Sequence, residues 1–173
     1  EYARTYSIDY ITPIKINSEE FYLSALEYNC DLFVSMSFNQ IFRKRIIELP
    51  RLNAINCHAG KLPFYRGRNI LNWALINDEK EFGITVHYID EGIDTGDILV
   101  QEKYSIGNDE TGYELYTRAM HLGFLLLKDN YENIINNKLK PFSQKGLSSY
   151  YGKKNGKYTI DWKDSAKNIN NKI

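Results

Sequence analysis

The sequence predicts an α/β protein whose sheet is mostly parallel. Strand-like and helix-like segments alternate along the chain, at residues 31–38, 40–48, 52–58 and 68–77. Such alternation is typical of a parallel sheet covered by helices. Two further strand-like segments, residues 82–90 and 98–106, follow each other across one turn, which predicts an antiparallel addition to that sheet.

Local start and stop signals predict the elements of the N-terminal part. Residues 7–13 alternate in polarity and end at a proline, which predicts a short strand. Ser18 precedes two glutamates and marks a helix start. The buried face of that helix is predicted to carry Phe21, Ala25 and Leu26. Residues 31–38 form a compact apolar run, typical of a strand buried on both faces of a parallel sheet.

The later elements follow from similar signals. The amphipathic segment 40–48 ends before Pro50, and the loop 60–67 contains two glycines and a proline. Residues 68–77 are predicted to form a helix that buries Ile70, Trp73 and Ala74. Residues 109–137 have helical spacing throughout, whereas the segment from residue 138 onward is polar, with one short strand predicted at 158–161.

Length and charge limit the functional classes. A chain of 173 residues is long enough for one domain with a sizeable core. Lysine plus arginine equals aspartate plus glutamate at 22 each, so the basic surplus typical of nucleic-acid binders is absent. No apolar run approaches the roughly 20 residues that span a bilayer. We therefore expect a cytoplasmic protein with neither a nucleic-acid nor a membrane partner.

Both ends of the sequence indicate an excerpt from a longer protein. The chain begins with Glu1, and its opening residues resemble the end of a helix that leads into a strand. The last residues, 165–173, have a helical pattern that stops without a glycine. We expect further sequence on both sides.

Three polar residues at strand ends form the candidate catalytic site. Asn56 and His58 are two residues apart at the end of a predicted strand, and Asp94 lies in a turn-rich loop after another. An amide can donate to an oxyanion, an imidazole can transfer a proton, and a carboxylate can set the charge of that imidazole. These groups are sufficient for transfer of a carbonyl group to an amine.

Other readings of nearby residues are weaker or stay open. Cys57 faces away from its two neighbours on a strand, so a buried structural thiol is favoured over a nucleophile. His58, His87 and Asp94 are usable metal ligands, but no metal-binding spacing is present and we predict no metal site. His87 fits either a strand residue that faces a polar cleft or a catalytic role.

Two motifs resemble the folate-dependent formyltransferases. The pattern NxHxxxLPxYRG begins at Asn56, and GxTxHxIDxGIDTGDI begins at Gly83. The chain is most similar to the sugar N-formyltransferases and next to methionyl-tRNA formyltransferase. The resemblance implies a Rossmann-like formyltransferase catalytic domain that here lacks its first βαβ unit. It divides the chain into a catalytic core at 1–137 and a linker with the start of a C-terminal element at 138–173.

The resemblance also implies roles for individual residues. The catalytic set falls on Asn56, His58 and Asp94. The co-substrate 10-formyltetrahydrofolate is expected against Phe38, Asn39, Gln40, Ile41, Asp90 and Gly92. The acceptor is expected against Tyr65, Arg66, Arg68 and Trp73, where an arginine can bind phosphate.

The expected acceptor is the amine of a nucleotide-linked amino sugar for surface polysaccharide (lipopolysaccharide) biosynthesis. Three alternatives stay open: methionyl-tRNA as the acceptor, a formate-releasing hydrolase, and a degenerate fragment without enzymatic activity. A homodimer is also left open.

Overall fold

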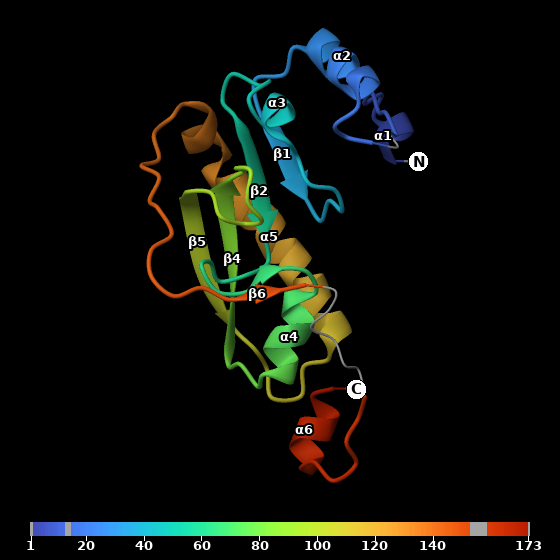
Figure 1. The fold of residues 1–173 in the computed structure, drawn as a ribbon, viewed down its shortest axis with the longest axis vertical. Helices are drawn as coiled ribbons and strands as arrows, with labels where there is room; N and C mark the ends of the chain where they lie inside the picture. The colour runs from blue at the N-terminus through green and yellow to red at the C-terminus, as the bar shows by residue number, and fades with distance from the viewer. Residues whose placement is uncertain (1, 13–14, 153–158, 173) are drawn as a thin grey trace.

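A computed structural model describes residues 2–12, 15–152 and 159–172 (Figure 1). Its main sheet has the order β1-β2-β4-β5. The strands are β1 (Phe33–Met36), β2 (Ala54–His58), β4 (Glu81–Tyr88) and β5 (Ile98–Ser105). The α/β class is confirmed. Within the described residues the sheet is mixed, since β1 and β2 are parallel while β2–β4 and β4–β5 are antiparallel.

Six helices and a second small sheet complete the described part. The helices are α1 (Tyr2–Thr5), α2 (Glu19–Tyr28), α3 (Lys44–Ile47), α4 (Ile70–Ile76), α5 (Gly112–Ile135) and α6 (Ala166–Asn170). The small sheet pairs β3 (Arg66–Gly67) with β6 (Tyr150–Tyr151) in parallel. Neither of its strands was predicted, because two-residue strands have no periodicity to detect.

Several predicted elements differ from the structure. Residues 7–12 form no strand and run at a distance from the sheet (Figure 1), and Ile8, Tyr10 and Ile11 are exposed. In β1, Val34 is 44% exposed, so this strand is not buried on both faces. Residues 159–161 form no strand, while Pro13 and Tyr158 lie outside the described residues.

The start of α2 was predicted correctly because its cap is local, whereas the helix predicted over residues 40–48 begins only at Lys44 and has no side-chain cap. The Ser18 hydroxyl accepts a hydrogen bond from the Phe21 N–H at the start of α2. Of the predicted buried face of α2, Ala25 is buried, Phe21 is half-buried and Leu26 is exposed. Thr111 and Glu114 form a reciprocal capping box at the start of α5, a few residues after the predicted start.

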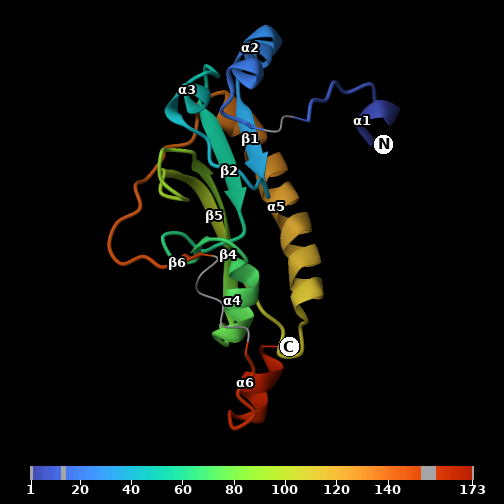
Figure 2. The same ribbon diagram turned by 45° about the vertical axis from the view of Figure 1, so that its right-hand side comes forward.

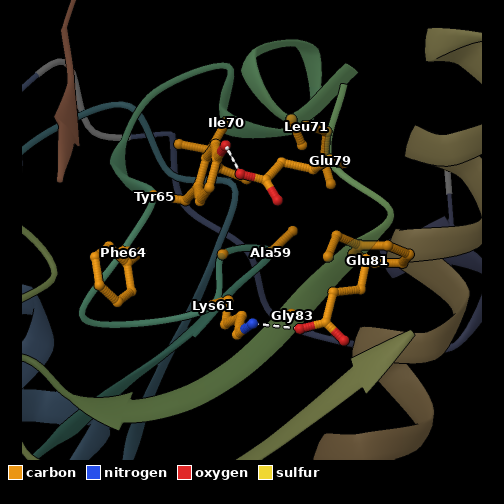
Figure 3. Close-up of a pocket in the computed structure, with 12 residues that line it drawn as sticks. Ala59, Lys61, Phe64, Tyr65, Ile70, Leu71, Glu79, Glu81 and Gly83 are labelled. Atoms are coloured by element: carbon orange, nitrogen blue, oxygen red, sulfur yellow. Dashed lines mark hydrogen bonds and ion pairs between the residues drawn. The ribbon is translucent and has the colours of Figure 1, made fainter. Parts of the chain in front are cut away.

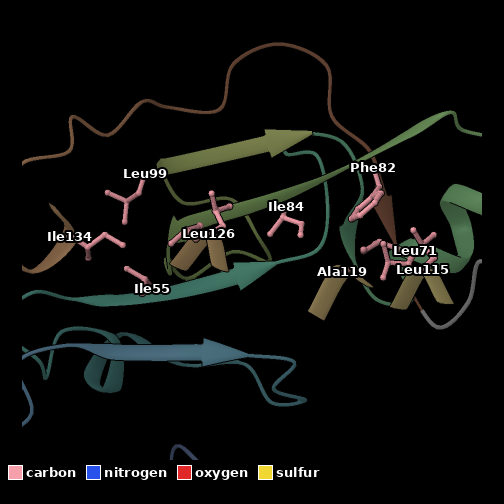
Figure 4. Packing of buried hydrophobic residues seen from close by; sticks show 11 residues of the cluster. Ile55, Leu71, Phe82, Ile84, Leu99, Leu115, Ala119, Leu126 and Ile134 are labelled. Atoms are coloured by element: carbon pink, nitrogen blue, oxygen red, sulfur yellow. The ribbon is translucent and has the colours of Figure 1, made fainter. Parts of the chain in front are cut away.

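The core lies between one face of the sheet and the helices α4 and α5. Phe82, Ile84 and Val86 alternate along β4 and point toward this core. Helix α5 runs along that face and contributes Leu115, Ala119, Leu126 and Ile134 (Figures 2 and 4). The opposite face of β2 and β4 is therefore available for polar side chains.

The segment after α5 returns to the sheet. It leaves the end of the helix, passes the β5 edge and crosses to β6 (Figure 1). Phe142 exchanges backbone hydrogen bonds with Ile98 on the way. The predicted boundary at residue 137 stays a prediction, but residues beyond it contact the predicted core. Within the described residues, no helix is both long and apolar enough to cross a bilayer.

Candidate active site

Strand alternation gathers polar residues on the face opposite the core. Asn56 lies opposite His87, and His58 lies opposite Thr85, in the β2–β4 register. Residues paired in this way project on the same face of a sheet. Cys57 points the other way, toward Gly123 of α5, and burial raises the pKa of its thiol to about 11. Cys57 is partly buried and packs against the core cluster, and its assignment as a structural thiol stays a prediction.

His58 is held in one tautomer by a backbone carbonyl. Its Nε2 lies 2.7 Å from the carbonyl oxygen of Tyr65, which is an acceptor, so Nε2 carries the proton. In the neutral ring, Nδ1 then has the lone pair, and it lies 3.7 Å from Asp94 Oδ2. Burial lowers the pKa of His58 more than the Asp94 charge raises it. His58 is therefore a neutral base whose proton-accepting atom faces a carboxylate.

Asp94 is held by contacts from three directions. Its Oδ2 accepts the Gly67 N–H at 2.8 Å, and its Oδ1 accepts the Asn56 side-chain amide at 3.3 Å. Burial raises the pKa of Asp94, but the adjacent His87, the positive charge that His58 gains when acid protonates it, and the Gly67 N–H together lower it to about 2. Asp94 is thus a largely buried carboxylate, with 12% of its side chain exposed, that stays ionised over the physiological range.

The loop that carries Asp94 has special backbone requirements. Asp94 has a φ of 53°, in the left-handed region that aspartate tolerates. A Cβ on Gly96 would lie 1.9 Å from the Tyr88 carbonyl oxygen, so only glycine fits there. Asp90 accepts from the Gly92 N–H and the Thr95 hydroxyl, a turn-forming role.

Asn56 and His87 share the Asp94 carboxylate. His87 Nδ1 lies 2.7 Å from the Tyr88 carbonyl, so this nitrogen donates. Its Nε2 lies 3.4 Å from Asn56 Nδ2 and 3.6 Å from Asp94 Oδ1. Without a proton, Nε2 accepts from Asn56, and with a proton the ring forms an ion pair with Asp94. The sequence left open whether His87 is a strand residue that faces a polar cleft or a catalytic residue. The structure places it beside Asn56 and Asp94 and leaves its catalytic role open.

The depressed pKa of Asp94 predicts a loss of stability in acid. A carboxyl group with a pKa near 3.8 unfolded and about 2 folded stabilises the protein above pH 4. This contribution, roughly 2 kcal/mol, is lost as the pH falls from about 4 to 2. We expect the difference in urea midpoint between wild type and Asp94→Asn to shrink over this window. A difference that is constant with pH would contradict the assigned ionisation.

A cleft of about 750 Å³ opens over this cluster. Asn56, His58 and Asp94 all line it. So do the six residues expected at the co-substrate, namely Phe38, Asn39, Gln40, Ile41, Asp90 and Gly92. Within the described residues, no group of histidines, cysteines and carboxylates is arranged to hold a metal ion.

The four residues predicted for the acceptor divide into two groups. Arg68 lines the cleft and donates to the Asn39 carbonyl, while the Arg66 guanidinium donates to Gln144. Tyr65 and Trp73 do not line the cleft, because each stacks on Tyr151, with ring centroids 5.1 and 5.0 Å apart. Arg66 does not line the cleft either, so the acceptor contacts predicted for these three residues stay predictions.

A second cavity, of about 250 Å³, lies beside the loop that follows His58 (Figure 3). Its apolar lining includes Ile70, Leu71 and Phe82. Its polar groups are paired: the Tyr65 hydroxyl donates to Glu79 at 2.7 Å, and Lys61 binds Glu81. Because neither His58 nor Asp94 lines this cavity, the larger cleft is the candidate active site.

Sequence reasoning missed the residues that support this cluster. Thr85 donates to the Gly60 carbonyl beneath His58, and Gln101 donates to Thr85 and to the Leu62 carbonyl. Ser149 accepts from the Tyr65 N–H. Thr85 was detectable, since it shares the alternation that places His87, whereas the distant partners gave no local signal.

Comparisons with known proteins identify the family of the chain. A family model described as formyl transferase matches residues 4–129. The chain belongs to the formyl transferase family. Among curated relatives of this formyl transferase chain, the methionyl-tRNA formyltransferase of Alkaliphilus oremlandii is 44% identical over 147 residues, covering 83% of the chain and 47% of the relative. That of Citrifermentans bemidjiense is 35% identical over 175 residues, covering 99% of the chain and 54% of the relative.

Solved structures of sugar N-formyltransferases share the fold. WlaRD, a sugar 3N-formyl transferase studied with dTDP and 5-N-formyl-tetrahydrofolate, has a TM-score of 0.80 and 30% identity over 99% of this chain and 60% of its own. An N-formyltransferase from Helicobacter canadensis, in complex with folinic acid and dTDP-3-aminofucose, has a TM-score of 0.79 and 30% identity. The match covers 99% of this chain and 61% of the Helicobacter chain. The formyl transferase chain spans about half the length of the curated relatives it matches.

Proposed function

We propose that the protein transfers a formyl group from 10-formyltetrahydrofolate to an amine. The observation that carries this proposal is the position of His58 Nδ1, 3.7 Å from an ionised and largely buried Asp94, in a cleft that both residues line. A neutral imidazole beside a fixed negative charge is suited to accept a proton from an attacking amine. Membership of the formyl transferase family supplies the reaction class.

The reaction balances with these groups. The amine nitrogen attacks the formyl carbon, the new C–N bond forms, and the carbonyl oxygen becomes an oxyanion. His58 Nδ1 takes the proton that the amine loses, and Asp94 stabilises the resulting imidazolium. The bond from the formyl carbon to the folate nitrogen then breaks, and His58 returns the proton to that nitrogen. The products are the formamide and tetrahydrofolate.

Asn56 is the proposed donor to the oxyanion. Its side-chain N–H groups make contacts of 3.3 and 3.4 Å with Asp94 and His87, longer than the usual 2.9–3.0 Å. Long hydrogen bonds are weak, so an oxyanion in the cleft can replace one of them at little cost. Transition-state charge favours that exchange.

The co-substrate is proposed to bind along residues 38–42 and the Asp90 loop. Phe38 is 42% exposed in the cleft and packs on Phe42, with ring centroids 5.3 Å apart, which offers an aromatic surface to a flat pterin. Two relatives at 30% identity were crystallised with formylated folates. Their complexes support a folate ligand for this cleft.

The proposed acceptor is a nucleotide-linked amino sugar, used in the cytoplasm for a surface polysaccharide. Both structural relatives at 30% identity contain dTDP or a dTDP-linked amino sugar. Arg68 lines the cleft and supplies positive charge for a diphosphate. Methionyl-tRNA is the second candidate, favoured by the 44% identity to a methionyl-tRNA formyltransferase.

An acceptor panel distinguishes the two candidates. We expect full-length protein with 10-formyltetrahydrofolate to release tetrahydrofolate with a dTDP-linked amino sugar and not with Met-tRNA. The matched control is the same nucleotide sugar with a hydroxyl in place of the amine, which should give no release. Turnover with Met-tRNA alone would replace the acceptor assignment, and tetrahydrofolate release without any amine would indicate a formate-releasing hydrolase. No release with any acceptor would favour the non-enzymatic alternative.

A further inference from the structure

Gln144 lies in the segment between α5 and β6, fifty residues beyond Asp94 in the sequence. Its side-chain nitrogen donates to the Asp94 carbonyl at 3.0 Å and to the Gly96 carbonyl at 2.7 Å. Its side-chain oxygen accepts from Arg66, at 3.1 Å from Nε and 2.6 Å from Nη2. One amide group therefore joins two loops that are separate in the sequence.

These two loops together hold the Asp94 carboxylate. Gln144 fixes the backbone at Asp94, which has the left-handed φ of 53°. On the other side, Gln144 fixes Arg66, and the next residue, Gly67, donates its N–H to Asp94 Oδ2 at 2.8 Å. A shift of either loop changes the distance between Asp94 and His58.

The rest of the segment holds the partner of the His58 ring. Ser149 accepts the Tyr65 N–H through its hydroxyl at 2.8 Å and the Arg66 N–H through its carbonyl at 3.0 Å. The Tyr65 carbonyl is the group that accepts from His58 Nε2. The segment after α5 thus touches both the loop that orients His58 and the loop that carries Asp94.

We propose that Gln144 is a positioning residue for formyl transfer, which sets the distance between the Asp94 carboxylate and His58 Nδ1. It contacts neither reactant and acts through Asp94. The expected effect of Gln144 on the rate of formyl transfer rests on the proposed function. The expected effect of Gln144 on the pKa of His58, through the position of Asp94, does not depend on that function.

The test uses two variants of the full-length protein. Gln144→Ala removes all these hydrogen bonds, while Gln144→Glu keeps an acceptor for Arg66 and places a carboxylate against the carbonyls of Asp94 and Gly96. We expect both variants to lower kcat by about 10- to 100-fold, the scale of a small misplacement of a catalytic group. The KM for the formyl donor should stay within about twofold, because binding contacts are kept.

The pH profile separates positioning from general damage. His58 is faced by Asp94, by the His87 ring at 6.3 Å between centroids and by the Tyr65 carbonyl. The Asp94 charge raises the pKa of His58, so displacement of Asp94 should lower it and move the acid limb of kcat/KM to lower pH. NMR titration of the His58 ring measures the same shift without turnover.

Asn130→Ala is the matched control, because Asn130 also donates its side-chain amide to a backbone carbonyl, that of Leu126, within α5. It should leave kcat and the His58 titration at wild-type values. An unchanged His58 titration in folded Gln144→Ala or Gln144→Glu would overturn the inference, even if both lose stability. If wild type transfers no formyl group, the proposed function fails, and the titration alone decides the role of Gln144.

Discussion

Replacing His58 by glutamine is expected to lower kcat/KM for formyl transfer by about 10²- to 10⁴-fold, the usual contribution of a positioned acid or base. Glutamine retains an N–H that can donate to the Tyr65 carbonyl, so the loop after β2 keeps its anchor. It has no group that accepts a proton near pH 7. Steady-state rates with the formyl donor and an active acceptor measure the effect.

His121→Gln is the control for this substitution, because His121 is an exposed histidine on the same chain, within α5. It should keep wild-type kinetics. Binding of the formyl donor to His58→Gln, followed by fluorescence or calorimetry, should remain within a few-fold of wild type. Wild-type turnover in His58→Gln would show that this histidine is structural and that another group accepts the proton.

Asp94→Asn is expected to reduce kcat by about 10²- to 10³-fold, since it removes the charge that stabilises a protonated His58. Asparagine accepts the left-handed φ of 53° as readily as aspartate, so the backbone of the loop is retained. Without the carboxylate, the pKa of His58 should fall further. The acid limb of kcat/KM should then move to lower pH.

The neighbouring Asp97→Asn change provides the comparison for this prediction. Asp97 is exposed and does not line the cleft. Its replacement should leave both kcat and the pH profile unaltered. Equal losses in the two variants would mean that the loop as a whole, rather than the Asp94 charge, limits turnover.

Features that depend on residues close together in the sequence could be predicted from it. Strand alternation predicted that Asn56 and His58 share a face that excludes Cys57, and the β2 register confirms it. The Ser18 cap likewise placed the start of α2. Residues 7–12 were predicted wrongly because alternation alone cannot supply a partner strand, and a strand forms only where its backbone groups are paired.

The residues that hold Asp94 and the loop after His58 in place could not be predicted, because they come from distant parts of the sequence. Gln144 is 50 residues from Asp94, and Ser149 is 84 residues from Tyr65. No spacing rule connects such residues, because their contact follows from the return of the chain after α5. Stacking of Tyr65 on Tyr151 was hidden for the same reason, while the assignment of Tyr65 to the acceptor stays a prediction.

The fate of the formyl carbon shows whether the protein transfers a formyl group to an amine through His58. Full-length protein is mixed with 10-formyltetrahydrofolate that is ¹³C-labelled in the formyl group and with an amine acceptor, and NMR follows the label in wild type and in His58→Gln. We expect wild type to move the label to the amine nitrogen and to form one formamide for each tetrahydrofolate released. His58→Gln should form the formamide at least about 100-fold more slowly. Label that collects as free formate, or formamide formed by His58→Gln at the wild-type rate, would contradict this expectation.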